Sequence, residues 1–244
     1  MHFDIPRGEV FRVDEVDVRL SATPHPFIAG RQEEIEANWL EEKRARPALF
    51  DGEVALLASL KLTGSRLEGT AHVVRYSAFL YWRGLRPVSS AEHCYAHAMP
   101  VSSEGALVAI RMSGHTVSAG LAYFASGSFE PTDFAGGRVD IGANMLREVR
   151  EETGLNLDGL PTDRCFHALS LPQGTVIFRR VFMNEPANAI ADRIRRFVSD
   201  KGDPEGEIAG PVVIRDPADL PDRLAPQMPA LIDWHFRTAR STYS

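Results

Sequence analysis

Residues 147–155 read Arg-Glu-Val-Arg-Glu-Glu-Thr-Gly-Leu and place three glutamates just before a glycine. We predict a helix from Ile141 to Thr153, because Asp140 can cap its first turn and Gly154 can end it. At about 100° per residue, the three carboxylates share an arc of roughly 100° on one helix face, beside an apolar stripe. The helix can therefore pack on a sheet and present its acids along the seam.

Glu148, Glu151 and Glu152 would repel one another unless a positive charge offset them. Carboxylate oxygens are the ligands that Mg²⁺ prefers, and Mg²⁺ in turn binds the phosphate oxygens of a substrate. A solvated acidic helix face is the alternative interpretation of such a run. Two neighbours favour the metal site, because Arg147 can orient one of the acids and Gly154 fixes the end of the acidic turn.

This segment resembles the Nudix box, the signature of the Nudix hydrolase family. The second half of that signature is Arg-Glu-aliphatic-any-Glu-Glu-any-Gly-aliphatic, and residues 147–155 match it at every defined position. Upstream, residues 125–131 (Ala-Ser-Gly-Ser-Phe-Glu-Pro) look like the strand and loop that lead into the box, with Gly127 as the opening glycine. Agreement at all the defined positions of the second half makes the resemblance specific.

The first half of the box departs from the family pattern. Counted back from Arg147, the expected glutamate falls on Val139 and the expected opening glycine on Asp133. With Gly127 as the opening glycine, the loop carries about six extra residues, around 134–138. The missing acid has three candidate replacements, Glu130, Asp133 and Asp140.

The resemblance covers residues 93 to about 222 in outline. It implies an α/β/α sandwich with a mixed β-sheet. It also implies hydrolysis of a nucleoside diphosphate linked to another moiety, with Mg²⁺ or Mn²⁺ as the cofactor. Carried over by position, the implied metal ligands are Glu148, Glu151 and Glu152, with the carbonyl of Gly127 as a further ligand.

The resemblance also implies an acid in a loop before a late strand, as a general base or an additional metal ligand. Glu205 and Glu207 precede a short strand predicted at 212–214, and Glu207 is favoured because residues 207–209 lead directly towards that strand. A solvated loop acid is the alternative. The predicted catalytic set is Glu151, Glu207 and Arg147. The predicted substrate-binding set is Arg111, His115 and Arg180, each of which also fits an ordinary surface position.

The composition is that of a globular chain. It has 244 residues, 44% of them hydrophobic and 25% charged, with a formal net charge of −6. This balance excludes a disordered or fibrous chain, and the acidic charge disfavours a dedicated nucleic-acid binder. The N-terminus lacks a signal-peptide pattern, and the apolar runs fall short of the roughly 20 residues of a membrane span. We therefore expect a soluble, cytoplasmic protein that binds a small molecule.

The alternation of apolar residues predicts strands interleaved with helices. In the first part we expect a strand near 16–20, a helix over 31–46 and a hairpin of 54–62 with 67–76, while 77–85 fits either a helix or a strand. Further strands are predicted at 93–101, 106–112, 121–125, 166–171, 175–182 and 212–214, and further helices at 187–198 and from 228. We expect a Nudix-like domain over 91–244 preceded by an α+β extension or lobe over 1–90.

The favoured substrate is a nucleotide sugar, because residues 1–90 loosely resemble Nudix hydrolases that cleave UDP-sugars. One alternative is a coenzyme A pyrophosphatase. Another is a non-catalytic Nudix-like domain that senses a nucleotide and regulates a partner. The presence of all three helix acids favours the enzyme, and the sequence leaves a homodimer open.

Overall fold

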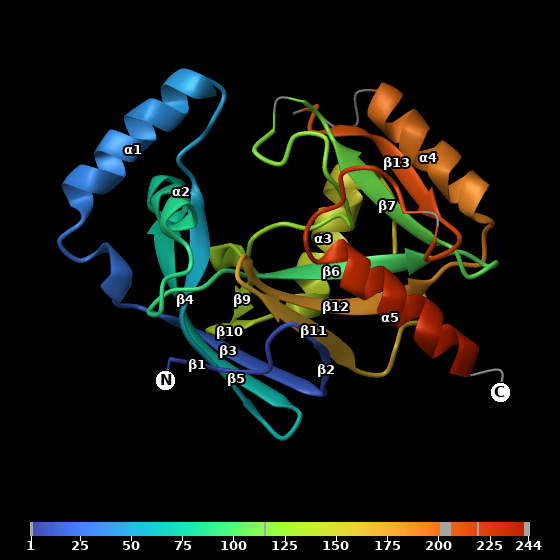
Figure 1. Cartoon of the computed structure of the whole chain (residues 1–244), viewed down its shortest axis with the longest axis horizontal. Coiled ribbons are helices and arrows are strands. Elements are labelled where there is room, and N and C mark those ends of the chain that lie inside the picture. The colour runs from blue at the N-terminus through green and yellow to red at the C-terminus, as the bar shows by residue number, and fades with distance from the viewer. Residues whose placement is uncertain (1, 115, 201–205, 219, 242–244) are drawn as a thin grey trace. The chain divides into compact units, whose positions relative to one another are not determined.

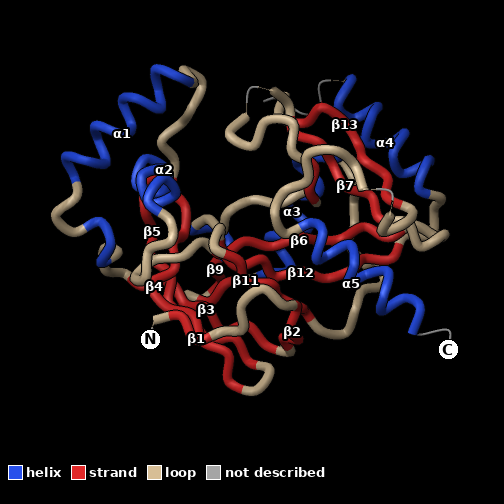
Figure 2. The backbone as a smooth tube through the Cα atoms, in the orientation of Figure 1, coloured by secondary structure: helices blue, strands red, loops and turns tan. Residues whose placement is uncertain are grey.

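The computed structural model describes residues 2–114, 116–200, 206–218 and 220–241 (Figures 1 and 2). The fold is mixed α/β, as predicted, with two β-sheets and five α-helices in this part of the chain. The chain divides into two compact units. Unit 1 comprises residues 1–96, 128–144 and 168–177, and unit 2 comprises residues 97–127, 145–167 and 178–244.

A six-stranded sheet forms the centre of unit 1, in the order β1-β4-β5-β3-β10-β9. These strands span Phe3–Asp4, Glu53–Thr63, Arg66–Arg75, Glu15–Ser21, Arg138–Val139 and Phe134–Ala135. The predicted hairpin of β4 and β5 turns at Gly64, whose φ of 63° is one that glycine adopts readily. β3 lies parallel to β5, so the N-terminal residues enter the middle of the sheet.

Residues 134–139, between the loop at 126–131 and α3 (Ile141–Thr153), form a small hairpin. β9 and β10 pair antiparallel with each other, and Arg138 of β10 pairs with Arg19 of β3. The hairpin therefore extends the sheet of unit 1. The sequence predicts a loop for these residues, because strands of two residues are too short to show an alternating pattern.

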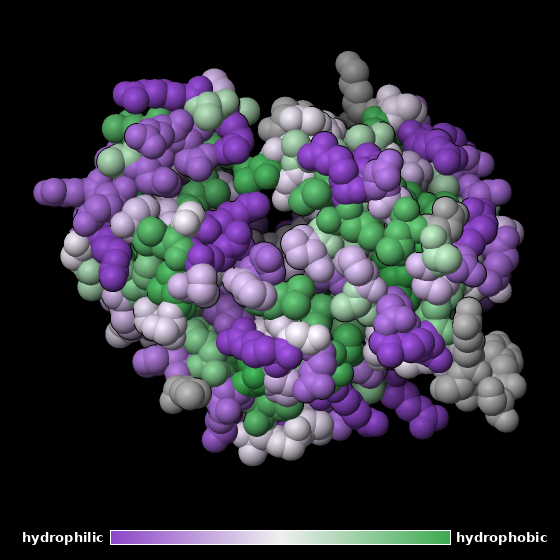
Figure 3. Space-filling model, viewed as in Figure 1, coloured by the Kyte–Doolittle hydropathy of each residue, from purple (hydrophilic) through white to green (hydrophobic). Residues whose placement is uncertain are grey.

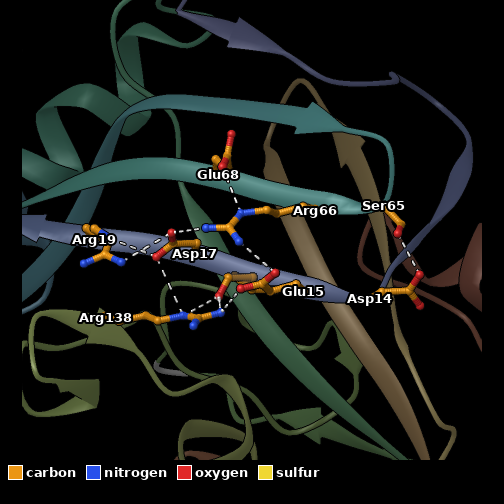
Figure 4. A network of polar contacts seen from close by, with 9 residues as sticks. Asp14, Glu15, Asp17, Arg19, Ser65, Arg66, Glu68 and Arg138 are labelled. Atoms are coloured by element: carbon orange, nitrogen blue, oxygen red, sulfur yellow. Dashed lines mark hydrogen bonds and ion pairs between the residues drawn. The ribbon is translucent and has the colours of Figure 1, made fainter.

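A network of ion pairs holds this hairpin to the sheet (Figure 4). Its members, called here the Asp17 network, are Glu15, Asp17, Arg19, Arg66, Glu68 and Arg138. Arg66 contacts Glu15 at 2.9 Å and Asp17 at 2.5 Å. Arg138 contacts Glu15 at 3.0 Å and donates to the carbonyl of Val16 at 2.6 Å. Strands β3, β5 and β10 are thus tied together through their side chains.

Two helices of unit 1 contact each other, α1 (Gln32–Ala45) and α2 (Tyr76–Leu85). Both bounds of α1 agree with the predicted helix to within one residue. Residues 77–85, whose sequence fits either a helix or a strand, belong to helix α2. As a helix they bury Phe79, Leu80 and Trp82 against Val54 and Leu56 of β4. Two short 3₁₀ helices complete the unit, η1 (Pro26–Ile28) and η2 (Pro131–Asp133).

The second sheet has the strand order β13-β7-β6-β12-β11-β2, and β8 pairs with β7. These strands span Ile208–Ile214, Leu107–Met112, Cys94–Val101, Gly174–Phe182, Phe166–Leu171, Val10–Val13 and, for β8, Ala122–Tyr123. The chain passes between the two units within β6, β11 and β12. β13 begins four residues earlier than predicted, because an edge strand accommodates Gly210 and Pro211 at an irregularity of the register.

The helices of unit 2 cover its part of this sheet. α4 (Ala187–Ser199) contacts β13 and β7, and α5 (Met228–Ser241) packs on β12, where the rings of Trp234 and Phe178 lie 5.0 Å apart (Figure 1). The remaining helix, α3 (Ile141–Thr153), begins in unit 1 and continues into unit 2.

The surface of the molecule is of mixed polarity. Hydrophilic and hydrophobic residues are interspersed on the face shown in Figure 3. None of the described helices combines the length and the apolar character needed to cross a membrane. Both cysteines are free thiols, Cys94 buried and Cys165 half-buried.

Candidate functional site

Helix α3 carries the acidic run and has the predicted bounds. At its start, the side chain of Asp140 accepts a hydrogen bond from the amide of Ala143 at 2.9 Å, as expected of a capping residue. At its end, Gly154 has a φ of 67°, and a Cβ there would lie 2.3 Å from Cδ2 of Phe197 in α4. A glycine is required at residue 154 both by its backbone conformation and by the close approach of α4.

The carboxylate of Glu148 lies directly over Gly127, and both residues belong to unit 2. A Cβ on Gly127 would be 2.2 Å from Oε1 and 2.4 Å from Oε2 of Glu148. Real Cβ atoms do not approach other atoms so closely, so a side chain at residue 127 would displace the carboxylate. Gly127 is therefore the residue that lets this buried carboxylate reach the backbone of the loop.

Glu152, one turn further along α3, reaches the neighbouring residue of the same loop. Its Oε2 accepts a hydrogen bond from the amide of Ser126 at 3.0 Å. Two carboxylates from successive turns of the helix thus meet the backbone of residues 126–127. This convergence brings together Gly127, Glu148 and Glu152, three of the residues singled out from the sequence.

Arg147 connects the acids of the run to one another. Its Nη2 lies 2.8 Å from Oε1 of Glu148, and its Nη1 lies 3.1 Å from Oε2 of Glu151. The side chain of Glu151 is 59% exposed, whereas that of Glu148 is 9% exposed. Arg147 therefore contacts both a buried carboxylate and an exposed one, and its orienting role stays a prediction.

The carboxylates of Glu148 and Glu152, over residues 126–127, meet some of the requirements of a site for a hard cation. Their oxygens are ligands of the type that Mg²⁺ prefers. The carboxylate of Glu148 lies too close to Gly127 for that residue to carry a Cβ, and the carboxylate of Glu152 is bonded to the Ser126 amide. Within the described ranges, however, no group of three or more His, Cys, Asp or Glu side chains is placed to hold a metal ion. The set of three glutamates with the Gly127 carbonyl stays a prediction.

Asp133 holds the entry loop of the box to the first turn of α3, within unit 1. Its Oδ2 accepts hydrogen bonds from the amide of Glu130 at 2.8 Å and from Nδ2 of Asn144 at 3.0 Å. Asp133 is buried, whereas Glu130 is exposed and Asp140 caps the helix. Among the three candidate replacements for the missing box acid, Asp133 is thus the one that fixes the loop.

Glu207 stands at the start of β13, where the sequence analysis expects a loop. The strand begins at the next residue, and the carbonyl of Glu207 accepts a hydrogen bond from the amide of Ser113, just after β7, at 2.7 Å. Strand pairing therefore fixes the backbone at this acid, whose side chain is half-buried. Glu205, the other candidate, lies outside the described residues.

The predicted substrate-binding residues have different surroundings. Nη1 of Arg111, on β7, donates to the carbonyls of Gly120 at 2.8 Å and Asp222 at 3.1 Å, so this arginine braces two loops. His115 lies outside the described residues.

Arg180 is more completely engaged than Arg111. Its Nε and Nη2 form a fork with the carboxylate of Asp163, each at 2.9 Å, and its Nη1 donates to Thr238 at 3.1 Å. The guanidinium also lies 4.7 Å from the centroid of Trp234. These contacts use every nitrogen of the guanidinium to join β12 and α5, which is a structural role.

The amide of Ser126 and the side chain of Asn144 belong to the site but are absent from the sequence analysis. A backbone amide has no signature in a sequence. Asn144 could have been found from its position, because it lies one turn after the capping Asp140 on the predicted helix and faces the entry loop.

The comparisons with known proteins are limited to likeness of structure. No protein-family model matches the sequence, and no curated protein matches it. The chain is similar to the crystal structure of DR0079 from Deinococcus radiodurans, with 13% identity, coverage of 75% of this chain and 99% of that one, and a TM-score of 0.44. It is also similar to the crystal structure of a MutT protein from Methanosarcina mazei Go1, with 16% identity, coverage of 45% and 94%, and a TM-score of 0.26.

Proposed function

We propose that this chain is a metal-dependent pyrophosphohydrolase that cleaves a nucleoside diphosphate linked to another moiety. The observation that carries the proposal is the convergence of Glu148 and Glu152 on the backbone of residues 126–127. It combines with the match of residues 147–155 to the second half of the Nudix box. A bound Mg²⁺ would neutralise phosphate charge and lower the pKa of a coordinated water.

Each residue of the site would have a separate role in this reaction. Glu148, Glu152 and Glu151 would hold the cation, with the carbonyl of Gly127 as a further ligand. Arg147 would keep Glu148 and Glu151 in place through the contacts at 2.8 and 3.1 Å. Glu207 would take a proton from the attacking water. The proposal does not depend on Arg180, which the fold already engages.

The favoured substrate class is a nucleotide sugar, by the resemblance of residues 1–90 to hydrolases of UDP-sugars. The test is a panel of UDP-sugars, ADP-ribose, NADH, dinucleoside polyphosphates, coenzyme A and nucleoside triphosphates, each with Mg²⁺ or Mn²⁺ and with product analysis by chromatography. We expect a nucleoside monophosphate and a sugar phosphate from a UDP-sugar. Tight nucleotide binding without turnover of any compound would overturn the proposed enzyme and favour a non-catalytic sensor.

A pair of matched variants tests the metal ligands. Glu152→Gln keeps the shape of the side chain and an acceptor for the Ser126 amide but removes the charge, so we expect turnover to fall at least about 100-fold. The control is Glu41→Gln, on an exposed position of α1. Near-normal kcat in Glu152→Gln, at an unchanged melting temperature, would remove this glutamate from the metal site.

Glu207 has its own test. If it takes the proton from water, Glu207→Gln should lower kcat by about 10² to 10⁴ while KM changes little. The bond to the Ser113 amide uses the carbonyl of Glu207, so the variant leaves the start of β13 intact. Unchanged kinetics would make Glu207 an ordinary solvated acid.

A further inference from the structure

A cavity of about 810 Å³ lies wholly within unit 1, and none of its lining residues belongs to the acidic run of α3. Cavities of roughly 300–1,000 Å³ are typical of sites for small organic ligands. Most of the lining side chains are apolar, and they include Phe3, Trp82, Val88 and Leu171. The indole Nε1 of Trp82 donates to the carbonyl of Ala91 at 3.0 Å, so Trp82 offers the cavity an apolar surface.

The walls of the cavity are fixed by the backbone. The amide of Leu60 in β4 donates to the carbonyl of His2 at 2.8 Å, which anchors the N-terminal segment to one sheet. The amide of Gly8 donates to the carbonyl of Ser170 in β11 at 2.8 Å, which anchors the same segment to the other sheet. Hydrogen bonds to both sheets therefore hold the N-terminal segment that lines the cavity.

One charged pair stands among these apolar walls. Nη2 of Arg7 lies 2.7 Å from Oε2 of Glu92, whose side chain is 11% exposed. The second carboxylate oxygen, Oε1, accepts from Thr175 at 2.5 Å, and Ser170 lies 3.3 Å from it. Both oxygens of Glu92 thus have partners, and the pair contributes no net charge to the cavity.

The hydrogen-bonding capacity that remains in this group is on the arginine. A guanidinium has five N–H groups, and the contacts of Arg7 are to Glu92 through Nη2 and to Ser170 through Nη1. The side chain of Arg7 is 44% exposed, so its other N–H groups can reach a ligand. The cavity therefore combines largely apolar walls with one ion pair and with N–H donors of Arg7 that neither Glu92 nor Ser170 uses.

We infer that this cavity is a binding site for an uncharged, mainly apolar small molecule that bears an oxygen or nitrogen acceptor. The ring or chain of the ligand would lie against Phe3, Trp82 and Leu171, and its acceptor would meet Arg7. An anionic ligand would compete with Glu92 for the same guanidinium. A cationic ligand would meet a carboxylate whose oxygens already have partners.

The inference is tested with four naphthalene probes that differ only in their head group. These are 2-naphthamide, 2-naphthoate, 2-(aminomethyl)naphthalene and 2-methylnaphthalene, each titrated into the full chain and followed by saturation-transfer difference NMR. We expect 2-naphthamide to bind at least about fivefold more tightly than the other three, which is the effect of about one net hydrogen bond. Absence of binding, or tighter binding of a charged probe, would overturn the inference.

Variants locate the probe in the cavity. Ser89→Trp places a large side chain on an exposed lining residue without touching the ion pair, and it should abolish binding of 2-naphthamide. Gln173→Trp, on an exposed neighbour that does not line the cavity, should bind the probe like the wild type. Equal binding by both variants would place the probe elsewhere and overturn the site.

A double variant tests the role of the arginine. Arg7→Met combined with Glu92→Gln removes both charges together, so that neither is left buried alone. We expect 2-naphthamide and 2-methylnaphthalene to bind this variant equally, after its melting temperature has shown it to be folded. A retained preference for the amide would exclude Arg7 as the donor. If the double variant does not fold, Arg7→Lys, which keeps the charge opposite Glu92, should reduce the same preference.

Discussion

The acids clustered in the two units meet arginines in both, through Arg147 in α3, but they connect different parts of the chain. In the Asp17 network of unit 1, Glu15, Asp17 and Glu68 each meet an arginine side chain, and the arginines come from three different strands. In the acidic run of α3, Glu148 and Glu152 turn towards the backbone of residues 126–127. The carboxylates of the Asp17 network join three strands through arginines, whereas those of α3 gather over one short loop, where we propose the cation site.

Removal of one charge from each cluster is the strongest test of this difference. Glu148→Gln should lower metal-dependent turnover at least about 100-fold, because the buried carboxylate over Gly127 would no longer attract a cation. Glu15→Gln in the Asp17 network should leave kcat within about twofold of the wild type. Steady-state kinetics with the substrate found in the panel gives both values. A comparable loss of kcat in the two variants would end the distinction between the clusters.

The glycine under Glu148 gives the next largest effect. Gly127→Ala would place a Cβ 2.2 Å from the carboxylate and force it away, and a displacement of about 1 Å can cost on the order of 100-fold in rate. Gly142→Ala is the matched control on α3, because its Cβ would meet Asp140 at an ordinary 3.5 Å. Normal turnover in Gly127→Ala would show that the position of Glu148 does not matter for the reaction.

The acidic helix is the part of the site that the sequence predicts well. The bounds of α3 follow from a capping aspartate, an apolar stripe and a terminal glycine, and each of these acts within one or two turns of chain. The approach of Glu148 and Glu152 to one short loop is a contact between distant segments. The resemblance to the Nudix box predicts that Gly127 lies near the acids of the helix. The geometry of a single helix cannot predict this contact.

The features that escaped prediction depend on tertiary contacts. β9 and β10 exist because β3 offers an edge to pair with, and two residues are too few to show a period. Likewise, the sequence leaves open whether Glu130, Asp133 or Asp140 replaces the missing acid, and the burial of Asp133 beside Asn144 is a contact that no sequence pattern shows. The sequence predicts a start of β13 at residue 212 and not at Ile208, because glycine and proline normally mark the end of a strand.

Removal of an arginine from each cluster should separate stability from activity. Arg138→Met deletes hydrogen bonds to Glu15 and to the carbonyl of Val16, so we expect a loss of about 1–3 kcal/mol in the free energy of unfolding and little change in kcat. Arg147→Met should instead lower kcat about tenfold, because Glu148 and Glu151 lose the side chain that positions them. Urea denaturation and steady-state kinetics on both variants measure the two effects. The reverse pattern would assign the structural role to the α3 cluster.

The smallest effect is expected from pH. Burial of Asp17 opposes its ionisation, but Arg19 and Arg66 lower its pKa below the ordinary value of 3.8. The unfolded chain therefore takes up a proton here at a higher pH than the folded chain does. The stability that this ionised group contributes is complete above about pH 4 and is lost as the pH falls through the folded pKa.

Asp17→Asn should accordingly melt at a lower temperature than the wild type near neutral pH, and the two melting temperatures should converge below about pH 4. The measurement is thermal unfolding of both chains from about pH 6 to about pH 2.5, with Glu41→Gln as an exposed control. The control should track the wild type throughout. The melting temperature of Asp17→Asn could instead stay below that of the wild type by a constant amount down to the lowest pH. Asp17 would then stabilise unit 1 by its shape and hydrogen bonds. The charge balance that sets the Asp17 network apart from the acidic helix would then have no measurable effect on stability.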